Sequence, residues 1–171
     1  MEQIRRLYKL YQRSGTDHGQ LHSARVLFLA LALAIVQAGK IRLSRVELSQ
    51  LCSAIVFHDI GMKNDHRVDD DHGKAGREVY EKNAGKSSDP AVSFLIEYHC
   101  LGDKLAEEYL KSTDTIQAKK RTWLLYQILK DADALDRVRF GLYDLDVNQL
   151  RLPISHKLVP LAVTAVTGIK I

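Results

Sequence analysis

The sequence contains few cysteines and few prolines. Its 171 residues include two cysteines, three prolines and one tryptophan. Cys52 and Cys100 are too few to form the disulfide framework of a small secreted domain, and both lie in apolar stretches that suit a free, hydrophobic cysteine. The charged N-terminus is followed by no apolar segment of the kind that secretory signals contain. We therefore expect a reducing, cytoplasmic location.

Long apolar runs and a strong excess of one charge are also missing. The longest apolar run, Val26 to Val36, is about half of what a membrane-crossing helix needs, so we expect no membrane segment. The net charge is only +4, and the basic residues are interspersed with acidic ones, so nucleic-acid binding is not indicated. The one compact basic cluster, residues 119–121, is interpreted as a solvated helix face.

Apolar residues recur mostly at helical spacing, and alternating strand patterns are short and rare. The length fits one domain that can bury a core without disulfides. We predict an all-α chain that forms a single compact helical bundle over residues 1–171, with its core at about 17–139. The tail, 140–171, is expected to pack on this core or on a partner, or to be the end of a truncated chain.

Capping and breaking residues place the helices. Ser44 and Glu47 form a capping-box pattern, and Asp89-Pro90 is typical of a helix start. In the second predicted helix the apolar residues from Val26 to Val36 cover all sides, which predicts a central helix surrounded by others. The predicted helices are one that ends at Gly15, then 17–37, 44–61, 72–81, 90–99, 106–110 and 115–133, with short ones near 144–150 and 158–166.

The dipeptide His58-Asp59 directly follows an apolar helical stretch. Burying these two polar groups without partners would be costly, so we expect them to hold a cation. His22 lies upstream and Asp133 lies far downstream. The chain thus presents the order His, His-Asp, Asp.

These residues and their flanks resemble the motifs of the HD-domain superfamily of metal-dependent phosphohydrolases. The similar segments are His22-Ser-Ala-Arg-Val, Phe-His-Asp-Ile-Gly at 57–61 and Asp-Ala-Asp-Ala-Leu-Asp-Arg-Val-Arg at 131–139. The resemblance implies a helical HD fold in which His22, His58, Asp59 and Asp133 bind a metal ion. Many members carry lysine at the position of Met62, and the Gly-Tyr-Pro signature of the cyclic-dinucleotide subfamily is absent, which weighs against that substrate.

Two further histidines, His72 and His99, occur in the order seen in binuclear HD proteins. That resemblance implies that they hold a second ion and that Asp59 bridges both. One ion or two therefore remain open. Imidazole and carboxylate ligands suit Zn, Fe, Mn, Ni or Co, whereas all-oxygen sites suit Mg; the native metal stays open among these six.

Substrate phosphates need cationic partners. Arg25 lies one helical turn from His22, and Arg137 lies one turn beyond Asp133. Lys63, in the loop after the His-Asp pair, is a third candidate. Each has a structural alternative, an ion pair with Asp131, Asp136 or a carboxylate of that loop.

The predicted function is hydrolysis of a phosphomonoester or phosphodiester in a nucleotide or related metabolite. In the hypothesised mechanism a metal-bound hydroxide attacks phosphorus, Asp59 and Asp133 orient it, and Arg25, Lys63 and Arg137 are the candidate cationic groups. Two alternatives stay open: an HD-type di-iron oxygenase, and a non-catalytic HD fold that senses a ligand or docks a partner. The sequence leaves the oligomeric state open.

Overall fold

The computed structural model describes residues 19–37, 42–62 and 71–168, and these ranges form helices and loops without a strand. The prediction of an all-α chain is confirmed. The helix predicted before Gly15 lies outside the described residues. The described α-helices are α2 (Gln20–Gln37), α3 (Arg45–Phe57), α4 (His72–Ala84), α5 (Pro90–Tyr98), α6 (Asp103–Ser112), α7 (Lys119–Asp136) and α8 (Val159–Thr167).

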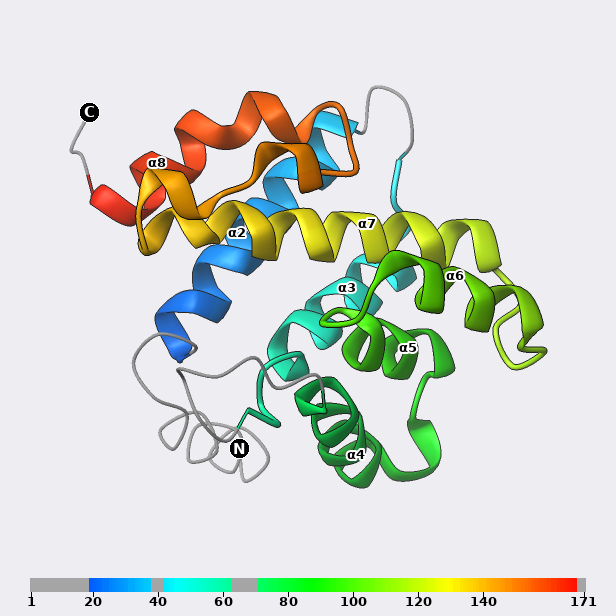
Figure 1. Ribbon diagram of the computed structural model, residues 1–171. Helices are drawn as coiled ribbons and strands as arrows, with labels where there is room; N and C mark the ends of the chain where they lie inside the picture. Colours follow the sequence, from blue (N-terminus) through cyan, green and yellow to red (C-terminus); the bar gives the residue numbers. More distant parts are fainter. Residues whose placement is uncertain (1–18, 38–41, 63–70, 169–171) are drawn as a thin grey trace.

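Two long helices, α2 and α7, cross at the centre of the fold (Figure 1). Helix α3 and helix α5 pack on each other on one side of α7, and α4 lies against α5. The core between them is made of fully buried aliphatic side chains such as Leu29 on α2, Leu51 on α3, Leu95 on α5 and Leu129 on α7. Burying each of these side chains stabilises the fold by about 1.5–3 kcal/mol.

Helix α2 is buried on only one side. Val26, Leu29 and Leu33 are fully buried, whereas Leu21 and Ile35 are each 73% exposed. The prediction that this helix is surrounded on all sides is therefore wrong. By length and composition alone α2 would also be apolar enough to cross a membrane, but the core helix of a soluble protein meets the same criterion.

Local capping signals are formed as predicted. The Ser44 hydroxyl accepts a hydrogen bond from the Glu47 amide at 3.2 Å, and the Glu47 carboxylate accepts one from the Ser44 amide at 2.7 Å. Asp89 accepts from the Ala91 amide at 2.8 Å, with Pro90 at the first helical position. Both caps satisfy amides that would otherwise have no partner.

Several helix boundaries differ from the predicted ones. Helix α7 begins at Lys119 rather than near 115, because Thr113, Thr115 and Gln117 form local side-chain hydrogen bonds that favour a loop. It ends at Asp136 and tightens into a 3₁₀ turn over Arg137–Arg139. Helix α3 ends at Phe57, so His58 and Asp59 lie in the turn that follows it.

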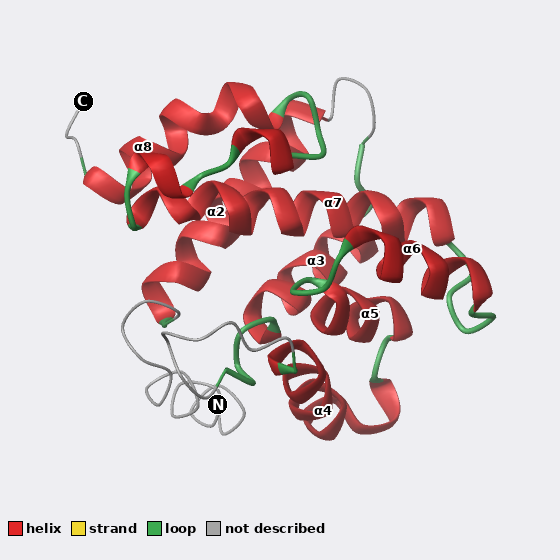
Figure 2. Cartoon of the chain, viewed as in Figure 1, coloured by secondary structure: helices red, strands yellow, loops and turns green. Residues whose placement is uncertain are grey.

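The C-terminal segment is tied to α7 by one buried carboxylate. Short 3₁₀ turns connected by loops lead from residue 137 to α8 (Figure 2). Asp131 accepts hydrogen bonds from the amides of Arg151 and Leu152 at 2.9 and 2.8 Å and from the Ser155 hydroxyl at 2.6 Å. Since Asp131 is fully buried, these donors supply the partners that its charge requires.

Candidate metal centre

Six side chains from five parts of the fold converge between α2, α3, α4, α5 and α7. We call them the six-residue cluster, and they are His22, His58, Asp59, His72, His99 and Asp133. His22 lies in α2, the His58-Asp59 pair follows α3, and Asp133 lies in the last turns of α7. His72 begins α4, and His99 directly follows α5. All four histidines and Asp59 are buried, while the Asp133 side chain is 36% exposed and marks the open side.

Asp59 lies between two pairs of histidines. Its Oδ2 atom is 3.1 Å from Nε2 of His22 and 3.4 Å from Nε2 of His58. Its Oδ1 atom is 3.4 Å from Nε2 of His72 and 3.3 Å from Nε2 of His99. Each carboxylate oxygen thus faces one histidine pair, which is the arrangement that a carboxylate bridging two ions adopts. Asp133 joins the first pair, with Oδ1 3.4 Å from Nε2 of His22.

The Nδ1 atoms of three of these histidines have acceptors outside the cluster. Nδ1 of His22 lies 2.8 Å from Oδ2 of Asp136. Nδ1 of His58 lies 2.8 Å from the Ile55 carbonyl oxygen, and Nδ1 of His99 lies 2.6 Å from that of Ile96. When Nδ1 carries the proton, the Nε2 lone pair is free to bind a cation.

Within each pair the Nε2 atoms face each other, at 3.2 Å for His22 and His58 and 2.9 Å for His72 and His99. Two lone pairs at such distances repel each other unless a proton or a cation lies between them. Buried imidazoles and carboxylates are borderline ligands that fit Mn, Fe, Co, Ni or Zn. The groups His22–His58–Asp59 and His72–His99–Cys100 each place their ligand atoms within 4.8 Å of one another, so the donor set fits one or two ions.

The pKa values follow from burial and from the charges within the cluster. Burial alone would lower the pKa of His22, but its hydrogen bonds to Asp136 and Asp59 and the charge of Asp133 raise it to about 9. Burial and the charges of His99 and His22 lower the pKa of His58 to about 4, against the opposing charge of Asp59. Burial would raise the pKa of Asp59, but the histidines around it hold the pKa well below its usual range.

Asp136 supports the cluster from behind His22. It is fully buried and accepts from Nδ1 of His22, from Nε and Nη2 of Arg25 at 2.5 and 3.1 Å, and from Nη1 of Arg139 at 3.1 Å. Burial would raise the pKa of Asp136, but His22 and Arg25 lower it. A carboxylate in this position fixes the tautomer and the ring orientation of a metal-binding histidine.

The three predicted cationic residues fall in different places. Arg25 forms an ion pair with Asp136, which is the structural alternative to a phosphate contact. Arg137 is exposed, and its Nε donates to the Asp144 carbonyl oxygen at 3.1 Å. Lys63 lies outside the described residues. The structure therefore brings the predicted ligands together and does not bring Arg137 to them.

Glycines allow α4 to approach the cluster closely. A Cβ atom added to Gly61 would lie 2.3 Å from the His72 carbonyl oxygen, and one added to Gly73 would lie 2.4 Å from the Glu97 carbonyl oxygen. Larger residues at either position would push α4 away from its neighbours. The backbone approach at these glycines thus sets where His72 lies relative to Asp59.

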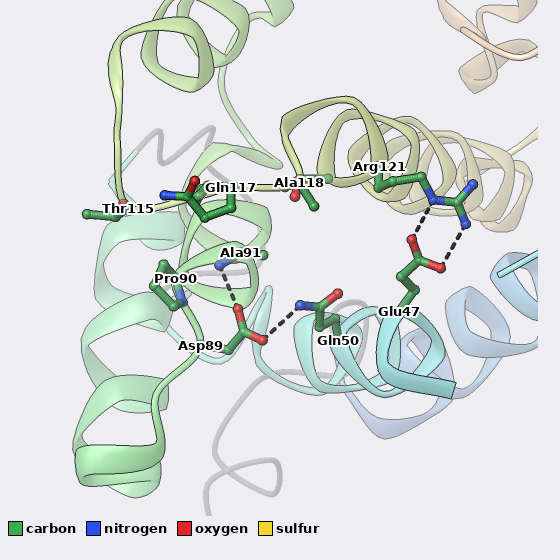
Figure 3. A pocket seen from close by; sticks show the side chains of 11 residues that line it. Glu47, Gln50, Asp89, Pro90, Ala91, Thr115, Gln117, Ala118 and Arg121 are labelled. Carbon is green, nitrogen blue, oxygen red and sulfur yellow. Dashed lines mark hydrogen bonds and ion pairs between the residues drawn. The ribbon is translucent and has the colours of Figure 1, made fainter. Parts of the chain in front are cut away.

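A separate cavity between the N-terminal ends of α3, α5 and α7 has its polar groups already paired (Figure 3). Glu47 binds Arg121 through both carboxylate oxygens, at 2.5 and 2.7 Å. Gln50 donates to Asp89 at 2.8 Å. Arg121, part of the basic cluster at 119–121, is held by these contacts, and the cavity offers no ligand set comparable with the six-residue cluster.

Comparison with protein families agrees with this geometry. The family model named HD-CE, an HD-domain family, matches residues 7–154. The chain belongs to the HD-CE family. No curated protein and no solved structure matches it. Membership of an HD-domain family, together with the buried histidine and aspartate groups, supports a possible metal site.

Three residues of this HD domain are not predicted as site residues from the sequence, although the structure places them near the predicted ligands. Cys100, interpreted from the sequence as a hydrophobic cysteine, lies with His72 and His99, and the other two are Asp136 and Arg139. The sequence suggests Asp136 only as an ion-pair partner, although its spacing of three residues from Asp133 on α7 indicates a shared helix face. Arg139 had no such signal, because α7 ends before it and the 3₁₀ turn changes the direction of its side chain.

Proposed function

We propose that this HD domain is a metal-dependent hydrolase of a phosphomonoester or phosphodiester bond in a nucleotide or a related phosphorylated metabolite. The observation that carries the proposal is the convergence of four histidine Nε2 atoms on the two oxygens of Asp59, with Asp133 on the open side. In this site the histidines and Asp59 are buried, whereas the Asp133 side chain reaches solvent, and water and a phosphate would bind on that side.

Each residue of the cluster would have a defined role in metal binding. His22 and His58 would hold one ion, His72 and His99 a second, and Asp59 both. Bound ions would lower the pKa of a coordinated water and neutralise charge on the phosphoryl group. Asp133 is the ligand nearest to solvent, so it would orient the attacking water, while Asp136 keeps the His22 ring in place through Nδ1.

The test combines metal analysis with activity. Protein purified without chelator is analysed by elemental mass spectrometry and assayed with bis(p-nitrophenyl) phosphate and a panel of nucleotides. We expect close to two ions per chain and metal-dependent release of nitrophenol or phosphate, both lost in Asp59→Ala. Asp114→Asn, which changes an exposed loop carboxylate far from the cluster in sequence, serves as the control.

Other outcomes would assign a different function. Turnover that persists in metal-free Asp59→Ala would refute the mechanism. Iron content with substrate-dependent oxygen consumption would identify an oxygenase, and metal binding without turnover of any substrate would favour a ligand-sensing fold. One ion per chain would limit the site to His22, His58, Asp59 and Asp133.

A further inference from the structure

Arg139 has a buried N–H group without a partner. Its side chain is 9% exposed, and Nη1 donates to Oδ2 of Asp136 at 3.1 Å. The guanidinium carbon lies 4.1 Å from the centre of the Phe140 ring, which fixes the plane of the group. The Nε atom, on another edge of that plane, is buried and has no hydrogen-bond acceptor. Such a group is rare in folded proteins and calls for an acceptor from outside the chain.

The two arginines on Asp136 are not equivalent. Arg25 uses both Nε and Nη2 to bind Asp136, so its planar donor edge is already occupied. Arg139 uses a single Nη1 contact and keeps its Nε edge available. Asp136 thus pairs with two guanidinium groups behind His22.

Arg139 also feels the negative charges of Asp133 and Asp59, two carboxylates of the six-residue cluster. Burial lowers the pKa of Arg139, and the charges of Asp136, Asp133 and Asp59 act against that change. Asp133 is the ligand on the open side of the cluster. Asp133 and Asp136 lie one turn apart near the end of α7, so the arginine that binds Asp136 is anchored to the same helix end as the aspartate on the open side.

We propose that Arg139 binds a phosphate oxygen of the substrate through its Nε–H group, with Asp136 and Phe140 holding the guanidinium in position. This inference rests on the proposed phosphohydrolase function and assigns the substrate-binding cation to Arg139 rather than Arg137. Guanidinium groups form short, charge-assisted hydrogen bonds with phosphate and match its geometry better than an ammonium group does.

The experiment uses Mn²⁺-loaded protein and measures inorganic phosphate binding by calorimetry, together with kcat and KM for bis(p-nitrophenyl) phosphate. The variants are Arg139→Gln, Arg139→Lys and Arg137→Gln, with the exposed Arg45→Gln as a charge-matched control. We expect Arg139→Gln to weaken phosphate binding and raise KM about 10- to 100-fold, with metal content unchanged. Arg139→Lys keeps the charge and should recover part of the affinity.

Each contrary result has a distinct meaning. Unchanged phosphate affinity in Arg139→Gln would overturn the inference and assign the Nε group to a water molecule. Loss of metal together with phosphate would show that Arg139 acts only by positioning Asp136 and His22, and dependence on Arg137 instead would return the role to that residue. If Mn²⁺-loaded wild-type protein neither binds phosphate nor hydrolyses any substrate, the proposed function itself fails.

Discussion

Replacing Asp136 with asparagine should weaken metal binding without touching a metal ligand. The carboxylate accepts four hydrogen bonds, from His22, twice from Arg25 and from Arg139. An asparagine keeps one acceptor oxygen and turns a donor NH₂ group toward at least one of these donors. The His22 ring then loses its fixed tautomer, and its Nε2 lone pair no longer points steadily at the cluster.

The expected loss follows from comparable sites. Removing a supporting carboxylate lowers metal affinity about 10- to 100-fold, which corresponds to about 1.4–2.7 kcal/mol of binding free energy. Breaking the buried pairs with Arg25 and Arg139 also lowers stability, by as much as roughly 3–5 kcal/mol when a buried charge loses its partner. The loss should fall on the ion that His22 and His58 hold and spare the one near His72 and His99.

The assay is a competition titration of Zn²⁺ or Mn²⁺ against a chromophoric chelator, run well below the unfolding temperature that circular dichroism gives for the variant. Asp114→Asn serves again as the control, because it removes one carboxylate charge from an exposed loop. Wild-type affinity for both ions in folded Asp136→Asn would refute the reasoning, since His22 would then be oriented without its carboxylate.

Three further predictions concern the attachment of the C-terminal segment to α7, the close packing of α4 beside the six-residue cluster, and the release of protons on metal binding. Asp131→Ala should lower the free energy of unfolding by about 3 kcal/mol or more. The substitution leaves the Arg151 and Leu152 amides and the Ser155 hydroxyl without their acceptor. A loss below about 1 kcal/mol, measured by urea denaturation, would contradict this prediction. Gly73→Ala should reduce the metal content from two ions toward one. The added Cβ would lie 2.4 Å from the Glu97 carbonyl oxygen and 2.8 Å from Sγ of Cys100, so α4 would have to move. Elemental analysis that still finds two ions would show that α4 can shift without losing the second ion. Metal binding near pH 7 should release about one proton. The pKa of His22 is raised to about 9, so His22 stays protonated until the pH rises through about 9, whereas His58, with a pKa of about 4, is already neutral. Metal affinity should therefore rise between pH 7 and pH 9, and calorimetry in buffers of different ionisation enthalpy that detects no proton release would count against this prediction.

Features that depend on neighbouring residues were predictable from the sequence. The Ser44 capping box and the Asp89-Pro90 helix start need only the residues beside them, and both formed as predicted. The order of the histidines and aspartates indicated which six side chains lie together in the fold, because the HD motifs are read along the chain. Neither the helix caps nor the order of the motifs requires knowledge of how distant helices pack.

Other features depend on how helices pack or on where a helix ends, and two predictions about them were wrong. Arg137 was placed by counting one α-helical turn from Asp133, but the helix ends at Asp136, and the tighter 3₁₀ turn rotates the following side chains differently. Helix α2 is apolar on every side, yet its packing against α7 covers only part of it. Neither result can be read from spacing alone.

The hydrogen bonds between Asp131 and the C-terminal segment determine how far the chain can be truncated without disturbing the fold. The family match ends at residue 154, whereas one of the groups that donate to Asp131 belongs to Ser155. Leu158 and Ala162, farther along, are buried in the core. A fragment trimmed to the family boundary would lack one hydrogen-bond donor to Asp131 and two side chains of the core. Asp131 lies only two residues before Asp133, a member of the six-residue cluster. The working boundary of this HD domain therefore includes α8 at least as far as Ala162, rather than lying at the end of the sequence match.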